Sequence, residues 1–205
     1  GTGRSYTIKE LASYSFLLEH FYIVDETTSM TKQDLNGTKL VTMDLSAKLG
    51  KEEPLVLIYH THGSETYKKV NGKEGSVIEV GTALTKELEN VYGIKTVHDK
   101  SVYDMVDGQL DRNAAYNFAG DSVEAALRKN PSVKVVIDLH RDSVENNIHL
   151  RTKINGKSAA QIMFFNGVSR LASKGDIGYL YNPNKEANLA FSLQMQLLCG
   201  KYYPD

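Results

Sequence analysis

The sequence predicts an α/β fold in which a mostly parallel sheet is flanked by helices. Two apolar runs rich in branched side chains, residues 55–59 and 133–139, have the composition of strands buried on both faces. Between them, apolar residues recur at spacings of three and four over 77–91 and 115–127, which is the helical pattern. Strands that alternate with helices favour parallel pairing, because each helix can carry the chain back to the start of the next strand.

The remaining elements are assigned from the same patterns. Residues 1–50 are expected to form an N-terminal layer packed on a core made by residues 51–205. The layer contains a helix over 8–22 and short strands at 21–25 and 40–45. The core adds a strand at 94–98, a polar loop at 99–111, a hairpin around Asn155-Gly156 with strands at 148–154 and 158–165, a loop at 166–184 and a final helix at 185–200.

Composition limits the classes of protein to which the chain can belong. Of its 205 residues, 41% are apolar and 24% charged, as in ordinary globular proteins. A net charge of −1 without a basic block argues against nucleic acid as a partner. The single cysteine, Cys199, excludes an internal disulfide framework and a cysteine-rich zinc site. No apolar run approaches the ~20 residues of a membrane span. No signal peptide is visible, and we expect any export signal or anchor to lie outside this chain.

Histidines follow both buried strands. His60 and His62 come directly after the first strand, and His140 comes directly after the second. Ligands of open α/β sheets bind beyond the carboxyl ends of the strands, so adjacent strands would bring these histidines together. Three protein ligands and a water are typical of catalytic zinc. The sequence therefore predicts a zinc site, for which we select His62, Glu65 of the H-x-x-E motif, and His140.

Several neighbouring residues have alternative interpretations. Glu74 and Glu79, near the start of the following helix, are alternatives to Glu65 as the carboxylate ligand. His60 would be a fourth contact, a residue that orients a ligand, or an oxyanion donor. Asp138 is placed to orient a ligand, and Arg141 and Asp142 either line the pocket or form a surface ion pair. The remaining histidines are expected to be structural: His20, His98 and His149.

At these motifs the sequence resembles the stage II sporulation protein P family. The similarity rests on Y-H-T-H-G-S-E-T-Y at 59–67, the glycine at 81, I-D-L-H-R-D-S at 137–143, I-N-G-K-S at 154–158 and K-Y-Y-P at 201–204. The resemblance implies a zinc-peptidase-like three-layer sandwich and a zinc-dependent N-acetylmuramoyl-L-alanine amidase with an associated endopeptidase activity. It also implies a membrane-anchored protein between mother cell and forespore. That protein would act on peptidoglycan during engulfment, with a stage II sporulation protein D-like lytic transglycosylase as its partner.

The sequence departs from the wider amidase pattern in one respect. These amidases carry a general-base glutamate in a segment like I-E-x-G-G on a strand near the C-terminus, and residues 51–205 contain no such segment. General acid–base catalysis contributes about 10²–10⁴-fold, so we expect poor hydrolysis from this chain. Arg141 is then the candidate catalytic residue, as the ligand of a substrate carboxylate. The competing interpretations are a metallocarboxypeptidase-like or deacylase enzyme and an inactive peptidoglycan-binding module.

Overall fold

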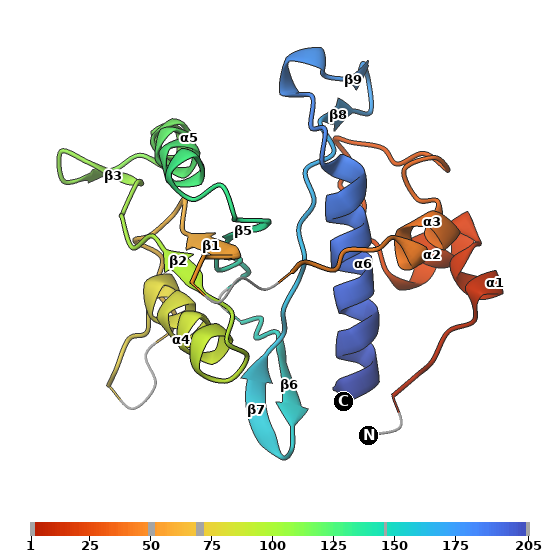
Figure 1. Cartoon of the computed structure of the whole chain (residues 1–205), viewed down its shortest axis with the longest axis horizontal. Coiled ribbons are helices and arrows are strands. Elements are labelled where there is room, and N and C mark those ends of the chain that lie inside the picture. The colour runs from red at the N-terminus through yellow and green to blue at the C-terminus, as the bar shows by residue number, and fades with distance from the viewer. Residues whose placement is uncertain (1–2, 49–51, 69–71, 146, 204–205) are drawn as a thin grey trace. The chain divides into compact units, whose positions relative to one another are not determined.

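The computed structural model describes residues 3–48, 52–68, 72–145 and 147–203. The chain divides into two compact units (Figure 1). One unit comprises residues 47–145, and the other joins residues 1–46 to residues 146–205. The C-terminal third of the chain therefore packs with the N-terminal segment, whereas the sequence suggested one boundary near residue 50. That boundary stays a prediction.

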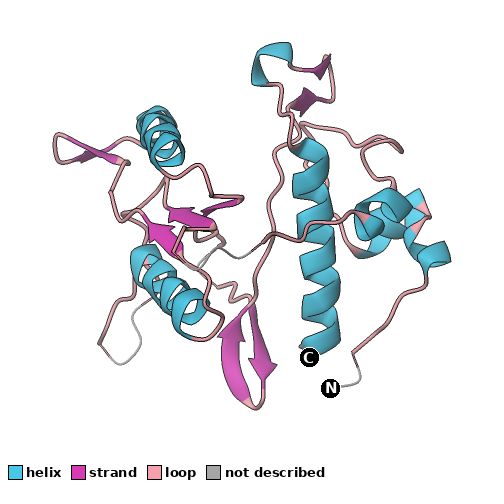
Figure 2. Ribbon diagram, in the orientation of Figure 1, coloured by secondary structure: helices cyan, strands magenta, loops and turns pink. Residues whose placement is uncertain are grey.

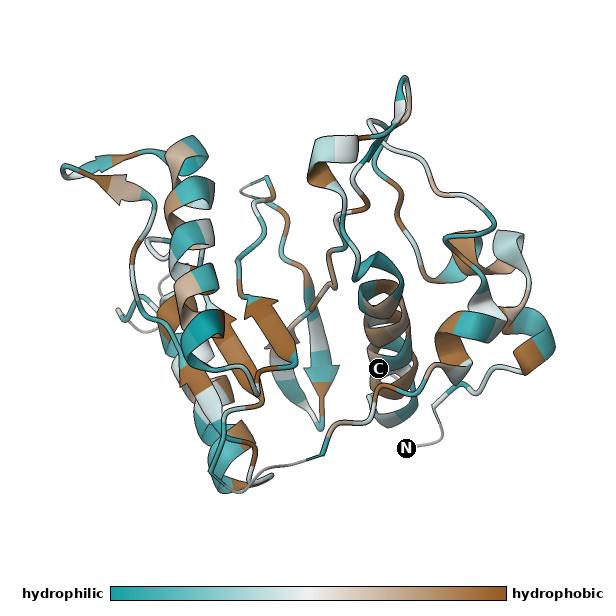
Figure 3. Cartoon of the chain, turned by 45° about the horizontal axis from the view of Figure 1, so that its top comes forward, coloured by the Kyte–Doolittle hydropathy of each residue, from teal (hydrophilic) through white to brown (hydrophobic). Residues whose placement is uncertain are grey.

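A three-stranded parallel sheet forms the centre of the unit at 47–145. Its strands are β1 (Val56–Tyr59), β2 (Thr96–His98) and β5 (Val135–Asp138), in the order β2-β1-β5. The central strand β1 is the most deeply buried, with Leu57 and Ile58 almost inaccessible to solvent. Figure 3 shows that apolar residues dominate these strands. The predicted parallel α/β architecture is thus confirmed. The strand β1 is buried as expected, whereas β5 is only partly buried, with Val136 44% exposed.

Helices flank this sheet (Figures 1 and 2). Helix α4 (Val77–Asn90) packs against β1 and β2, and begins with a capping box between Ser76 and Glu79. Helix α5 (Arg112–Lys129) buries Ala115 and Ala119, and Asp111 caps its first turn. Both helices match the predicted periodicity. The loop expected at 99–111 additionally contains a small hairpin of β3 (Met105–Val106) and β4 (Gln109–Leu110).

The second unit is built around the C-terminal helix α6 (Lys185–Tyr202). The N-terminal helices α1 (Ile8–Leu11), α2 (Tyr14–His20) and α3 (Gly37–Thr42) complete it. Leucines supply most of its core, from α6, from the three N-terminal helices and from the turn before α3: Leu11, Leu17, Leu35, Leu40, Leu189 and Leu193. The strands predicted at 21–25 and 40–45 are wrong. The first stretch is irregular, and the second begins inside α3, where Asn36 caps the helix and Leu40 joins the leucine core.

Two hairpins and a short helical turn complete this unit. The predicted Asn155-Gly156 turn is confirmed: it joins β6 (Arg151–Ile154) to β7 (Lys157–Ala160), and both turn residues have positive φ. The strand predicted over 158–165 is shorter, because pairing stops at residue 160. The loop expected at 166–184 contains β8 (Arg170–Leu171), β9 (Gly175–Asp176) and the 3₁₀ helix η1 (Gly178–Leu180).

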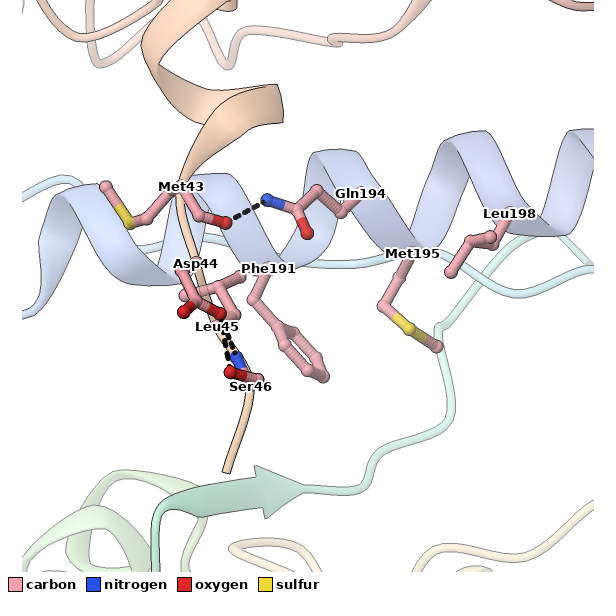
Figure 4. Close-up of a pocket in the computed structure, with 8 residues that line it drawn as sticks. All are labelled: Met43, Asp44, Leu45, Ser46, Phe191, Gln194, Met195 and Leu198. Carbon is pink, nitrogen blue, oxygen red and sulfur yellow. Dashed lines mark hydrogen bonds between the residues drawn. The ribbon is translucent and has the colours of Figure 1, made fainter. Parts of the chain in front are cut away.

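A pocket of about 330 Å³ lies beside α6 (Figure 4). Gln194 at its wall donates hydrogen bonds to the carbonyl oxygens of Leu40 and Met43, which fixes the segment after α3 against α6. The lining is mixed, and no predicted site residue belongs to it: Met43, Asp44, Leu45, Ser46, Phe191, Gln194, Met195 and Leu198. The chemistry indicated by the sequence lies in the other unit.

Candidate functional site

Strand pairing brings the predicted histidines to one edge of the sheet. β1 and β5 run parallel with Tyr59 opposite Asp138, and the Leu139 amide donates to the Tyr59 carbonyl. The residues that follow each strand therefore leave the sheet together. The rings of His62 and His140 are in edge-to-face contact, with centroids 5.2 Å apart. The predicted convergence of two histidines distant in sequence is present in the structure.

Asp138 fixes the orientation of His140. Its carboxylate accepts a hydrogen bond from His140 Nε2 at 2.8 Å, and two more from the amide and hydroxyl of Thr61, at 2.9 and 2.6 Å. The Asp138 bond raises the pKa of His140, with burial opposing it. Burial alone would raise the pKa of Asp138, but its hydrogen bonds outweigh that effect and lower it. With Nε2 engaged, Nδ1 is the nitrogen that His140 has free for a ligand.

Glu65 lies in the same cluster, and two donors hold its carboxylate. Arg112 Nη1, from the first turn of α5, donates to Oε1 at 3.1 Å, and the Arg141 amide donates to Oε2 at 2.9 Å. The Glu65 side chain is only 4% exposed, and its charge is one of those that raise the pKa of His140. The predicted carboxylate is therefore held by a guanidinium and by the backbone amide next to His140.

The two alternative glutamates are occupied elsewhere. Glu74 accepts a hydrogen bond from the hydroxyl of Thr66 at 2.8 Å. Glu79 completes the capping box of α4 by accepting from the Ser76 amide at 2.9 Å. Capping satisfies helix amides that have no intrahelical partner, so Glu79 has a structural role here. Of the three candidates, Glu65 is the one whose contacts belong to the histidine cluster.

His60 and His98 form a second histidine pair, in which His60 is fully buried and His98 is partly buried. Their Nε2 atoms are 2.9 Å apart, and His60 Nδ1 donates to the Leu139 carbonyl. His60 Nε2 is then the acceptor, and His98 Nε2 the donor, when both rings are neutral. Burial lowers the pKa of both rings, which favours that neutral state. A Cβ at Gly81 of α4 would lie 2.6 Å from His98 Nε2 and 2.7 Å from His60 Nε2, so this position requires a glycine.

Residues 99–116 contribute further groups around the His62–His140 pair, and sequence reasoning missed them. Asp104 is fully buried and accepts hydrogen bonds from the amide and hydroxyl of Ser64, at 3.1 and 2.6 Å. Tyr116 contacts the His62 ring edge to face, with centroids 5.3 Å apart. The signal that could have found Asp104 is its place in the loop after β2, which ends at the same sheet edge as β1.

The rings of His62 and His140 are at a separation that would allow both to bind one metal ion. Two imidazoles bound to one zinc ion at about 2.1 Å in tetrahedral geometry have ring centres about 5 Å apart, close to the separation seen here. His62 Nδ1 is buried without a hydrogen-bond partner among the described residues. No group of three or more histidine, cysteine or acidic side chains within those residues has the arrangement of a metal site. The pair therefore fits zinc, whereas the third ligand is not in position.

The fold and these contacts define an α/β protein with a polar cluster of histidines and carboxylates at the carboxyl edge of a parallel sheet. The family model of stage II sporulation protein P matches residues 7–205, and the chain belongs to that family, which supports a role in sporulation. It is 26% identical to stage II sporulation protein P of Bacillus subtilis (strain 168) over 164 residues, which covers 75% of this chain and 38% of that relative. No solved structure matches the chain.

Proposed function

We propose that this chain carries the hydrolytic centre of a zinc-dependent peptidoglycan hydrolase, an N-acetylmuramoyl-L-alanine amidase with endopeptidase activity. The observation that carries the proposal is the convergence of His62 and His140 from separate strands at one sheet edge. A zinc ion bound there would lower the pKa of a bound water to about 7 and polarise the scissile carbonyl. Family membership supports the same setting, since peptidoglycan is the barrier that engulfment has to remodel.

In this proposal some side chains bind the zinc ion, one orients a ligand and one binds substrate. His62, His140 and Glu65 hold the ion, and Asp138 keeps the His140 ring in place through the 2.8 Å bond to Nε2. Arg141 binds a carboxylate of the stem peptide, since a guanidinium suits bidentate pairing with carboxylates. Its Nε is buried without a hydrogen-bond partner among the described residues, which leaves a donor for substrate.

The cellular setting is part of the proposal. Peptidoglycan between mother cell and forespore is the substrate, a stage II sporulation protein D-like lytic transglycosylase the partner, and an anchor on the full-length protein keeps the centre at the membrane. Within the ranges that the structure describes, no helix is long and apolar enough to cross a bilayer. The weak net charge agrees with a substrate other than nucleic acid.

One observation favours a second candidate, a peptidoglycan-binding module without catalysis. Both carboxylate oxygens of Glu65 are occupied by donors, so the third ligand would have to change partners to reach an ion. The amidase and the binding module share the fold and the histidine pair. They differ in whether bound zinc leads to cleavage.

The deciding experiment measures zinc content and cleavage on the same samples. The wild-type chain and the variants His62→Ala, His140→Ala and His149→Ala are dialysed against buffered zinc, and metal is counted by mass spectrometry. His149 is exposed, belongs to neither cluster and serves as the matched control. We expect one zinc per chain for the wild type and the control, and a loss in the other two variants.

Cleavage is followed by mass spectrometry of fragments released from purified peptidoglycan. Free stem peptides beginning with L-alanine are the expected product. Zinc binding without any such product supports the binding module, and release of C-terminal residues from plain peptides indicates a carboxypeptidase. Absence of zinc from the wild-type chain at micromolar free zinc would overturn the proposal.

A further inference from the structure

Asp104 is a fully buried carboxylate to which the proposed chemistry gives no task. It lies in the loop after β2, and its oxygens accept hydrogen bonds from the amide and hydroxyl of Ser64. Burying a charged group costs several kcal/mol unless donors or a cation compensate for the lost water. The two bonds from Ser64 satisfy only part of the capacity of a carboxylate, which can accept about four. A nearby donor would supply the remaining compensation.

His62 provides the matching unsatisfied group. Its Nδ1 is buried without a hydrogen-bond partner among the described residues, and it lies 3.9 Å from Asp104 Oδ2. A small rotation of the ring would bring this pair to hydrogen-bonding distance. Asp138 and His140 already form a carboxylate–histidine pair of this kind, at 2.8 Å and through Nε2 of the ring.

The loop that carries Asp104 is fixed against the turn that carries His62. A Cβ at Gly63 would lie 2.9 Å from the Ser101 carbonyl oxygen and 3.1 Å from Val102 Cα, so the backbones meet at van der Waals distance. The Asp104 carbonyl also accepts the Asp111 amide at 2.9 Å, just before α5 begins. Asp104 is therefore held in place from both ends of its loop and faces one histidine.

We propose that Asp104 is a positioning residue for His62: its carboxylate keeps the Nδ1–H tautomer and thereby directs Nε2 to the ion. The inference rests on the proposed zinc site, and it adds that each histidine of the pair has its own carboxylate partner: Asp138 for His140, and the fully buried Asp104 for His62. Such partners fix the ring and raise its basicity, and their loss costs about 10–100-fold in metal affinity.

The first test needs neither metal nor a variant. Nitrogen-15 chemical shifts of the imidazole rings in the zinc-free wild-type chain report which nitrogen of each histidine carries the proton. We expect His62 to be protonated at Nδ1 when its ring is neutral. A neutral His62 protonated at Nε2 overturns the inference, and this outcome is independent of whether zinc binds.

The second test measures zinc affinity by chelator competition for the wild type, Asp104→Asn and Asp99→Asn. Asp99 anchors the same loop through Tyr103, Ser101 and Ser122, so its variant controls for loosening of the loop. We expect Asp104→Asn to bind zinc 10–100-fold more weakly and Asp99→Asn to bind it at near wild-type strength. Equal affinity of Asp104→Asn and the wild type overturns the positioning role.

Cobalt substitution separates positioning from direct ligation. The visible spectrum of bound Co²⁺ reports the number and type of ligands, and Asp104→Asn should leave it unchanged at saturation. A change of coordination would show that Asp104 is itself a ligand, which contradicts the inference. If the wild type binds no zinc, the proposed function fails while the tautomer measurement still decides the role of Asp104. The tautomer measurement also stands if Asp104→Asn does not fold.

Discussion

Replacing Gly81 with alanine tests whether α4 packs closely against the His60–His98 pair. The added Cβ would lie 2.6–2.8 Å from atoms of both rings, where a carbon atom does not fit without movement. His60 has no free direction to move, because the Leu139 carbonyl holds its Nδ1 and the residue is fully buried. Overpacking of this kind costs about 1–3 kcal/mol.

A second effect opposes this cost. Alanine is favoured over glycine inside a helix by about 0.5–1 kcal/mol, so the net destabilisation should be about 0–2.5 kcal/mol. Gly120 in α5 supplies the matched control, since a Cβ there meets nothing within 4 Å. Gly120→Ala should therefore stabilise by about 0.5–1 kcal/mol, as expected for an open helical site.

The assay is urea unfolding with hydrogen exchange at the amides of β1, which reports on the unit at 47–145. Opposite signs for the two glycine variants would support the steric argument. If the β1 amides exchange as slowly in Gly81→Ala as in Gly120→Ala, the close packing of α4 on the His60–His98 pair is refuted. Zinc affinity measured on the same samples would show whether a shift of His60 reaches His62, two residues along the chain.

Three further predictions concern Asp34, Gly156 and Arg112. Burial would raise the pKa of Asp34, but hydrogen bonds from Lys185, Thr31 and Arg170 hold it well below its usual value. The contribution of Asp34 to the free energy of unfolding is therefore fully present above the pKa of the unfolded state, about 3.9. It is lost as the pH falls through the lower pKa of the folded state. Asp34→Asn should cost about 3 kcal/mol at pH 7 and less at pH 2, by urea unfolding. Gly156→Ala should destabilise the β6–β7 hairpin by about 1 kcal/mol, because φ at this turn position is 77°. Gly167→Ala, where a Cβ meets nothing within 4 Å, should not destabilise the protein. Amide exchange in the hairpin measures the difference. Arg112→Ala should tighten zinc binding by removing a positive charge next to Glu65, and unchanged or weaker binding in chelator competition would contradict this.

The sequence predicted the parts of the fold that hydrophobic periodicity specifies. The strands β1 and β5 and the helices α4, α5 and α6 each have a pattern that one burial environment imposes, so their existence was predictable. The strand prediction at 40–45 was wrong. The segment L-V-T-M-D-L has the composition of a strand, but the Asn36 cap and the leucine core impose a helix on its first half. Tertiary packing overrode local propensity there.

The same distinction explains what was found at the candidate site. His62 and His140 were predictable because each follows an apolar strand, and strand order is all that is needed to bring them together. Asp104 and Arg112 lie outside the periodic segments, and Tyr116 lies within one, where helical periodicity does not show which side chains reach a site. Their proximity to the histidines depends on the path of the chain after β2 and on the cap at Asp111, which only the structure supplies.

The contact between Arg112 and Glu65 bears directly on whether the cluster can accept an ion. An ion pair whose cation is about half exposed is worth about 0–1 kcal/mol, because water screens it and ordering the side chain has an entropic cost. Zinc binding at structural protein sites releases about 10 kcal/mol or more. Exchange of Arg112 for a cation at Glu65 would therefore cost little compared with what the metal supplies. The amide of Arg141, the residue after His140, would still hold the second carboxylate oxygen. The occupied glutamate is thus compatible with the proposed hydrolase, and the effect of Arg112→Ala on zinc affinity measures how much the exchange costs.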